Sequence, residues 1–352
     1  MNQDWQNFLV QHHAHIDLGY VQHFGDLAAE LEVTLNGNVL CDLSQFGTLK
    51  VSGDDAQNFL QNLLSSDVQE INLQHAQLSS LNTPKGRMLA SIYIWRTASA
   101  YFLQLPSNLC SAIQKRLSMY ILRSKVKIED VSAQYIGLGV AGKNTAEFLQ
   151  HNFGTIPKKI GAVEHLEFAS IIQVGTQRFQ IYISATQASS LWQKLSADTT
   201  AVGSPCWDWL NIRDGIPIIV PATQEQFVPQ MVNLEILGGV NFKKGCYPGQ
   251  EIVARMQYLG KLKRRMYRAH IPQKHLKDGT FPQAGDELFS DDLEGQASGM
   301  VVNAALAPNG GCELLAVIQI SSHEGHTIHH LSIQGPALAF LPAPYSLVGS
   351  GN

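Results

Sequence analysis

A single cysteine in a glycine-rich, basic stretch is the residue whose surroundings most favour chemistry. Residues 244–249 read Lys-Gly-Cys-Tyr-Pro-Gly, and apolar residues then recur at helical spacing from 252 to 256. Pro248 suits the first turn of a helix, so Cys246 is expected just before a helix start. Backbone N–H groups and the helix dipole favour a thiolate there, which predicts a reactive thiol. A buried structural cysteine, the commoner fate of a lone cysteine, is the alternative.

Length and composition restrict the classes of protein that this chain can belong to. A chain of 352 residues with 45% hydrophobic and 15% charged residues is expected to fold into two or more domains. The net charge of −4 argues against dedicated non-specific binding of nucleic acid. Five cysteines without a Cys-x-x-Cys pair suit a reducing compartment. No apolar run is long enough for a membrane span, and the N-terminus lacks signal-peptide features, so we predict a cytoplasmic protein that does not enter a membrane.

Pairs of strands alternating with single helices predict an α+β protein. Asn36-Gly37 between two apolar runs is typical of a hairpin of strands 31–35 and 39–43. After about residue 266, five short strands predict a small antiparallel barrel, closed or nearly closed. Dinucleotide, P-loop and serine-hydrolase motifs are absent from the sequence. The other predicted segments are an N-terminal helical arm within 1–30, helices 54–64, 108–120, 143–151 and 188–195, a turn at 83–87 before strand 89–95, and a strand pair 168–174 and 178–184.

A second stretch, residues 207–217, has two opposite interpretations. Trp207 and Trp209 stand close to the pair Arg213-Asp214. Two indoles beside a carboxylate could line a slot for a flat, polar heterocycle. The other interpretation is a core helix with buried indoles, and composition alone favours it.

The histidine and acidic groups of the C-terminal region are not predicted to bind metal. Asp291-Asp292-x-Glu294 is typical of a solvated turn. The histidines at 323, 326, 329 and 330 lack the fixed ligand spacing that zinc usually requires. We therefore predict no metal site.

Several segments together resemble one known family. Residues 244–251, Lys-Gly-Cys-Tyr-Pro-Gly-Gln-Glu, resemble the Lys-Gly-Cys-Tyr-x-Gly-Gln-Glu signature of the YgfZ-type folate-binding proteins. These proteins are relatives of the glycine-cleavage T protein and are linked to tRNA modification and iron–sulfur cluster maintenance. Residues 42–56 and 226–239 resemble further parts of that family. The resemblance covers roughly residues 30–340.

The resemblance implies a fold and a cofactor. It predicts a T-protein-like α+β fold with a C-terminal antiparallel β-barrel, divided into two modules over 1–257, a barrel over 258–345 and a flexible tail over 346–352. The modules and barrel would enclose a folate-sized cavity with Cys246 near its mouth. Tetrahydrofolate is the implied cofactor, with Trp207 and Phe46 as pterin walls and Asp214 as a hydrogen-bond acceptor.

Roles for residues of the signature region also follow from the resemblance. Cys246 would act as a nucleophile, a redox thiol or a transient cluster ligand. Lys244 is assigned to the same catalytic site and, like Arg255, would favour the Cys246 thiolate or hold an anionic partner. Arg255 would favour the thiolate or hold an anionic partner, and Gln250 and Arg255 are assigned to folate contacts. A basic cluster could attract the glutamate tail of folate or be a solvated face, and the sequence favours neither; it consists of Lys261, Lys263, Arg264 and Arg265.

The implied function is that of a folate-binding accessory protein. It would support iron–sulfur cluster assembly or repair and iron–sulfur-dependent tRNA methylthiolation, as a monomer with weak tRNA contact. Its partners would be iron–sulfur enzymes such as tRNA methylthiotransferases. One alternative is a tetrahydrofolate-dependent aminomethyl or one-carbon transferase, but residues 88–91, Met-Leu-Ala-Ser, lack the acidic residues that aminomethyltransferases carry there. Another is a direct RNA-binding modifier, so whether this is an enzyme stays open.

Overall fold

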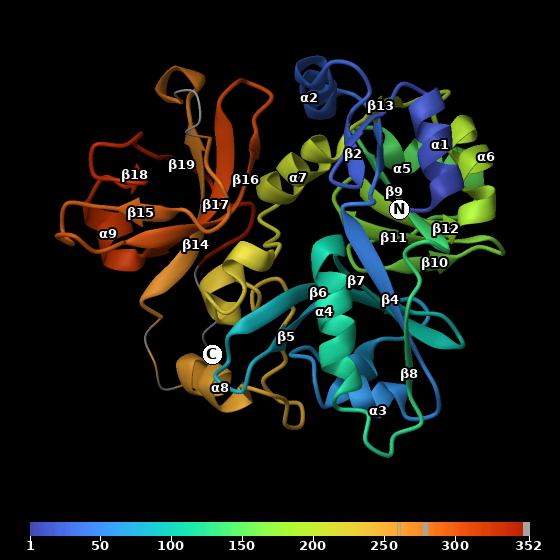
Figure 1. The fold of residues 1–352 in the computed structure, drawn as a ribbon, viewed down its shortest axis with the longest axis horizontal. Helices are drawn as coiled ribbons and strands as arrows, with labels where there is room; N and C mark the ends of the chain where they lie inside the picture. Colours follow the sequence, from blue (N-terminus) through green and yellow to red (C-terminus); the bar gives the residue numbers. More distant parts are fainter. Residues whose placement is uncertain (259, 261, 277–280, 348–352) are drawn as a thin grey trace. The chain divides into compact units, whose positions relative to one another are not determined.

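The computed structural model describes residues 1–258, 260, 262–276 and 281–347, and contains both helices and strands (Figure 1). Two compact units alternate along the sequence. Unit 1 comprises Met1–Leu60, Val68–Gln77 and Ile92–Trp207, and unit 2 comprises Gln61–Asp67, Leu78–Ser91 and Asp208–Asn352. A helix long and apolar enough to cross a membrane is not found in the described residues. The predicted boundary at residue 257 stays a prediction.

Unit 1 contains a six-stranded sheet with helices packed on one side. Its only parallel pair is β13 with β3, and the other neighbours are antiparallel. Apolar side chains of α1 (Gln3–Gln11) and α6 (Ala185–Leu195), among them Trp5 and Trp192, are buried in one cluster with residues of this sheet. The strands in spatial order are β10 (Val163–His165), β11 (Ala169–Gly175), β12 (Arg178–Ser184), β9 (Tyr135–Ala141), β3 (Val39–Asp42) and β13 (Thr200–Val202).

The part of a second sheet that belongs to unit 1 provides the opposing wall of the core of this unit. Trp95 and Phe102 of this sheet pack with Ile172 and Tyr182 of the first sheet, and the Trp95 and Tyr182 ring centroids lie 4.1 Å apart. The two sheets therefore face each other across an aromatic layer. The second sheet has the order β5 (Gln77–Asn82), β6 (Met88–Arg96), β7 (Ala100–Pro106), β4 (Phe46–Ser52) and β8 (Lys127–Asp130).

The predicted strand at 31–35 is wrong. This segment lies in helix α2 (Leu27–Asn36), because the Asp26 carboxylate caps the helix start by accepting hydrogen bonds from the N–H groups of Ala28 and Ala29. Gly37 follows as the C-cap and β3 begins at Val39. Asn36-Gly37 therefore ends a helix, and a local capping interaction overrides the hairpin signal.

Most other predicted elements are confirmed, but the N-terminal segment predicted as a helical arm also contains a pair of short strands. The β11–β12 hairpin turns at the predicted residues, and the turn at 83–87 precedes β6. The helix predicted at 54–64 is shorter than expected. The remaining elements are β1 (His15–Asp17), β2 (Tyr20–His23), α3 (Ala56–Gln61), α4 (Ser107–Ser118), α5 (Thr145–Phe153), α7 (Ser204–Arg213), α8 (Gln250–Tyr258) and the short 3-10 helices Val68–Glu70, Pro221–Thr223, Pro229–Val232 and Gln273–His275.

The C-terminal part of unit 2 is a curled antiparallel sheet. It forms a half-barrel around an apolar cluster that includes Leu288, Val301 and Leu314. The prediction of an α+β fold with an antiparallel C-terminal region is confirmed, with β19 as an additional strand. The order is β18 (His329–His330), β15 (Glu287–Phe289), β16 (Gly299–Leu306), β17 (Cys312–Gln319), β14 (Arg264–Ile271) and β19 (Ala339–Leu341), and α9 (Ile320–Gly325) follows β17. The predicted tail lies outside the described residues from residue 348 on.

Candidate functional site

Cys246 is the one exposed thiol among the five cysteines, none of which forms a disulfide. Cys41, Cys110, Cys206 and Cys312 are buried. Burial raises the pKa of Cys110 and of Cys312 to about 12, so these two thiols stay protonated at neutral pH. Cys246 precedes α8, as the sequence predicts, and α8 begins at Gln250. Reagents and partners in solution therefore have access to Cys246, whereas its reactivity stays a prediction.

A buried lysine anchors the loop that carries Cys246. The Lys244 Nζ atom donates hydrogen bonds to the carbonyl oxygens of Gln61 at 2.6 Å, Leu64 at 2.7 Å and Ser66 at 2.8 Å. The residue is 9% exposed, and burial lowers the pKa of the Lys244 ammonium to about 8. All three hydrogens of the ammonium are thus used by carbonyl groups. The contacts of Lys244 favour a structural role, and its predicted action on the thiol stays a prediction.

Gly249 allows a tight contact at the start of α8. Its φ angle is +81°, and a Cβ atom placed there would lie 2.5 Å from the carbonyl oxygen of Thr83 and 2.5 Å from the Cα atom of Gly86. Only glycine accepts both the backbone conformation and the close approach. The turn at 83–87 therefore packs against the residues that follow Cys246. A Cβ at Gly245, by contrast, would meet no atom within 4 Å.

Two predicted folate contacts in unit 2 are engaged by protein groups. The Asp214 Oδ1 atom lies 3.0 Å from Arg213 Nε in an ion pair, and Gln250 Nε2 donates to the carbonyl oxygen of Lys244 at 3.3 Å. Gln250 thereby adds a second anchor to the Cys246 loop. Folate contacts by Asp214 and Gln250 stay predictions.

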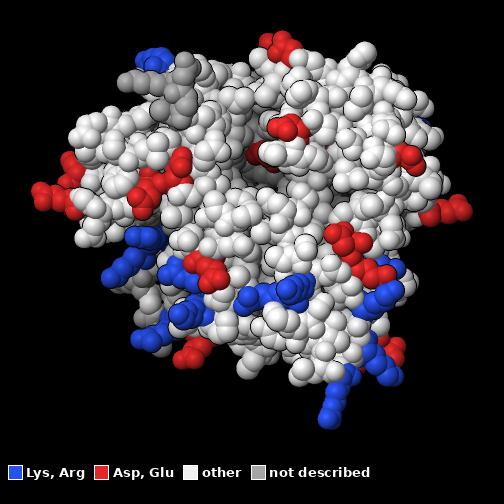
Figure 2. Space-filling view, viewed as in Figure 1, with Lys and Arg blue, Asp and Glu red and all other residues white. Residues whose placement is uncertain are grey.

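Basic side chains gather on α8 and on the segment that follows it. Figure 2 shows Lys and Arg side chains over α8 and the start of β14. Arg255, Lys263 and Arg264 are exposed, whereas Arg265 pairs with Glu235 at 3.0 Å. Lys261 lies outside the described residues. Arg265 is therefore less available to an anionic partner than the exposed members of the cluster.

Trp207 lies in the core of unit 1. Its ring packs over Gly139, where a Cβ atom would lie 2.4 Å from Trp207 Cζ3. The guanidinium of Arg178 lies 4.1 Å from the ring centroid. The indole Nε1–H is buried and has no hydrogen-bond partner among the described residues. Residues 207–213 are helical and their indoles are buried, which confirms the core-helix interpretation. A bound ligand could still supply the acceptor that the Trp207 N–H lacks among the described residues.

Phe46 lines a cavity between the two sheets of unit 1. This small cavity, of about 60 Å³, is also lined by Thr48, Gln104 and Tyr182. A larger cavity of about 420 Å³ shares Thr48, Tyr135 and Tyr182 as walls. The larger volume falls within the usual range for small-molecule sites.

The predicted site residues fall into two groups. Phe46 and Trp207 belong to unit 1, whereas residues 244–255 and Asp214 belong to unit 2. Sequence reasoning missed Gln104 and the anchoring contacts of Lys244. The signal for Gln104 was a glutamine within the apolar strand Ala100–Pro106. The contacts of Lys244 depend on a loop 180 positions away in sequence, and no local pattern predicts them.

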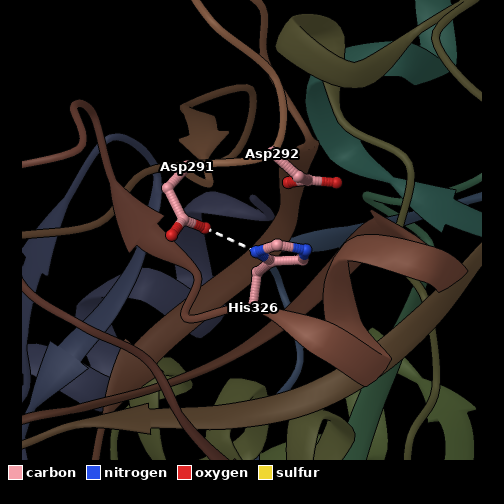
Figure 3. Close-up of side chains that lie close together, drawn as sticks. All are labelled: Asp291, Asp292 and His326. Atoms are coloured by element: carbon pink, nitrogen blue, oxygen red, sulfur yellow. Dashed lines mark hydrogen bonds and ion pairs between the residues drawn. The ribbon is translucent and has the colours of Figure 1, made fainter.

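One cluster has the composition of a metal site. Figure 3 shows Asp291, Asp292 and His326, whose ligand atoms lie within 4.8 Å of one another. Asp291 Oδ1 lies 2.7 Å from His326 Nδ1, and Asp292 accepts hydrogen bonds from the hydroxyls of Ser290 and Ser322. All three residues of the cluster are exposed. Protein groups thus account for the arrangement, and no metal is assigned to it.

Comparisons with known proteins agree with this architecture. The family model described as the GCVT N-terminal domain matches residues 18–244. The crystal structure of glycine cleavage system aminomethyltransferase T from Bartonella henselae superposes with a TM-score of 0.79, at 16% identity over 98% of this chain and 97% of that chain. The fold therefore places this chain in the glycine-cleavage T-protein class.

Curated relatives narrow the assignment. The tRNA-modifying protein YgfZ of Photorhabdus laumondii is 31% identical over 315 residues, which cover 88% of this chain and 92% of the relative. The tRNA-modifying protein YgfZ of Escherichia coli O127:H6 is 29% identical over 314 residues, covering 88% and 93%. The chain belongs to the YgfZ family.

Proposed function

We propose that this protein is a folate-binding accessory protein that supports iron–sulfur enzymes acting on tRNA. The observation that carries the proposal is the exposed thiol of Cys246 in a loop anchored by the buried Lys244. Relatives that align over most of the chain are named tRNA-modifying proteins. Five cysteines without a disulfide among them suit a reducing compartment, which supports action in the cytoplasm.

Features of unit 1 fit a reduced folate. The indole N–H of Trp207 is a buried donor without an acceptor in the part of the chain that the structure describes, and Phe46 offers an aromatic wall beside a cavity. A folate is a flat, polar heterocycle with an acidic tail, and such ligands are held by aromatic walls and a few directed polar groups. When bound, the reduced folate supplies one-carbon or redox chemistry. Trp207 and Phe46 would bind and orient its ring.

Cys246 is the group that we assign to the iron–sulfur partner. A thiolate is a ligand for iron and a nucleophile, and the other four thiols of the chain are buried. The exposed Arg255 on α8 would attract anionic groups of the partner or of folate. The three possible roles of Cys246 are nucleophile, redox thiol and transient cluster ligand. Each of these roles requires an accessible sulfur atom.

A tetrahydrofolate-dependent transferase is the second candidate. Residues 88–91 bring no carboxylate to the start of β6, and the Ser91 hydroxyl already accepts a hydrogen bond from the N–H of Ile219 at 3.0 Å. A proton-transferring carboxylate at this place is what such chemistry would use. Steady multiple turnover of tetrahydrofolate with formaldehyde or an aminomethyl donor would favour the transferase over the accessory role.

Equilibrium titration with 5-formyltetrahydrofolate tests the folate part of the proposal. Trp207→Phe removes the indole N–H while keeping an aromatic ring, and we expect the affinity to fall about 3- to 10-fold, as for loss of one hydrogen bond. Trp192→Phe, in the helix-side core of unit 1, is the matched control and should leave the affinity unchanged. Failure of the wild-type protein to bind any reduced folate would reject the proposal.

A further inference from the structure

An aromatic pair is exposed at the end of α8. Tyr258 is 65% exposed, and its ring meets the ring of Phe242 edge to face, with the ring centroids 6.1 Å apart. Phe242 thus supports one side of the tyrosine ring, and most of the tyrosine remains open to solvent. A single exposed aromatic side chain needs no explanation by itself. The charge of the segments beside this pair gives it a possible use.

Basic side chains lie next to the aromatic pair. Arg255 precedes Tyr258 by three positions in α8, so the two side chains project from the same side of the helix. Lys243 directly follows Phe242 in the chain and is exposed. Figure 2 shows Lys and Arg side chains gathered over α8 and the start of β14, where the residues Lys-Arg at 263–264 are both exposed.

The turn at 83–87 adds a further cation to this surface. A Cβ atom at Gly86 would lie 3.1 Å from the Cβ atom of Ile252 in α8, so the turn packs directly on the helix, and Lys85 in the turn is exposed. Among the described residues of this turn and of 241–264, the exposed charged side chains are five cations and a single acid. The whole chain instead has a net charge of −4, so the positive excess is local. We call this part of unit 2 the α8 basic surface; it consists of Lys85, Lys243, Phe242, Arg255, Tyr258, Lys263 and Arg264.

The combination of cations and an open aromatic ring fits a nucleic-acid strand. Phosphate groups are attracted to lysine and arginine, and unpaired bases stack on aromatic rings. Bases inside a duplex are already stacked, so the open ring of Tyr258 favours a single-stranded segment or a loop. An acidic protein segment would use the cations alone. The exposed Cys246 lies in the loop that joins Lys243 to α8, and it is therefore part of the same region.

We propose that the α8 basic surface binds an unpaired segment of RNA, with phosphate groups on the cations and one base stacked on Tyr258. This inference rests on the proposed function for the choice of tRNA as the RNA concerned. It adds to that function a surface that holds the RNA beside the loop of Cys246.

Titration with a fluorescently labelled oligouridylate of about 12 nucleotides tests the role of the cations. The double variant Lys263→Gln with Arg264→Gln should weaken binding about 10-fold or more at about 0.1 M salt, and should lower the salt slope by about 1.4, which is about 0.7 for each phosphate contact. The matched control is Lys158→Gln with Lys159→Gln, two consecutive exposed lysines of unit 1. It changes the net charge equally and should leave the affinity unchanged. Equal losses in the two double variants would overturn the assignment, because binding would then follow net charge alone.

Tyr258→Leu tests the stacked base. It keeps an apolar side chain but removes the ring, and we expect binding of the oligouridylate to weaken about 5- to 100-fold, the range for loss of one stacked base, with unchanged affinity for an RNA duplex of the same length. Tyr120→Leu, at an exposed tyrosine of unit 1, is the control and should bind both RNAs like the wild-type protein. Equal losses for the single strand and the duplex would overturn the stacking contact.

Two measurements on the wild-type protein complete the test. Displacement of the oligouridylate by poly-L-glutamate at equal charge concentration would indicate an acidic protein partner and overturn the assignment to RNA. A protein that binds 5-formyltetrahydrofolate but no oligouridylate at about 0.1 M salt would also overturn it, while leaving the proposed folate binding intact. A protein that binds the oligouridylate but no reduced folate would instead reject the folate part of the proposed function.

Discussion

Replacing Lys244 by methionine is expected to destabilise the loop that carries Cys246. The change leaves the carbonyl oxygens of Gln61, Leu64 and Ser66 without their donor, at about 1–3 kcal/mol for each unsatisfied buried group. It also removes the cost of burying the ammonium. The lowering of the Lys244 pKa from 10.5 to about 8 puts that cost at about 3 kcal/mol, since one pKa unit is about 1.4 kcal/mol.

With a central value of about 2 kcal/mol for each of the three carbonyl groups, the loss of about 6 kcal/mol less the gain of about 3 kcal/mol leaves a net loss of about 3 kcal/mol in the free energy of unfolding at pH 7. Urea denaturation followed by circular dichroism measures this loss. Lys243→Met is the matched control, because the neighbouring Lys243 is exposed, and it should change the free energy of unfolding by less than about 0.5 kcal/mol. Equal stability of Lys244→Met and Lys243→Met would refute the anchoring role.

The lowered pKa of Lys244 also predicts that the free energy of unfolding depends on pH. Because the folded-state pKa of Lys244 lies below the unfolded value, the unfolded chain binds a proton between about pH 8 and 10.5 that the folded chain does not. The wild-type protein should therefore gain stability relative to Lys244→Met as the pH rises through this window, by up to about 3 kcal/mol. A stability difference between the two proteins that stays constant or shrinks from pH 8 to 10.5 would contradict this reasoning.

Two further predictions concern the same loop. Gly249→Ala should lower the free energy of unfolding by about 2 kcal/mol or more, because a left-handed backbone disfavours alanine and its Cβ would meet Thr83 and Gly86; Gly245→Ala, where the Cβ meets no atom within 4 Å, should be nearly neutral in the same urea assay. Alkylation of the native protein with iodoacetamide should label Cys246 before the four buried cysteines, and peptide mass spectrometry that finds rapid labelling at Cys110 or Cys312 would contradict the structure.

The sequence predicts the parts of this fold that local patterns encode. The β11–β12 hairpin and the turn before β6 follow from strand periodicity and turn residues, and both are confirmed. The prediction of a strand at 31–35 is wrong because the Asp26 cap stabilises a helix there. The sequence also predicts that Cys246 precedes a helix, because proline, glycine and the spacing of apolar residues are all local features.

The contacts that define the candidate site are not local and were not predictable. Lys244 bonds to carbonyl groups about 180 residues earlier in the chain. Gln104 lies beside Thr48 and Tyr93 only because β4, β6 and β7 pair in the folded sheet. A sequence shows that a glutamine interrupts an apolar strand, but only the packed structure shows that its Nε2 atom is buried without a partner among the described residues.

The proposed function assigns the accessible thiol of Cys246 as the reactive group of a folate-binding accessory protein. The most direct test is the level of methylthiolated nucleosides in tRNA from a deletion strain of the source organism, measured by mass spectrometry after complementation. Cys246→Ser should fold and bind folate like the wild-type protein yet fail to restore methylthiolation, whereas Cys312→Ser, which changes a buried cysteine, should restore it in proportion to the folded protein present. Full restoration by Cys246→Ser would contradict the claim.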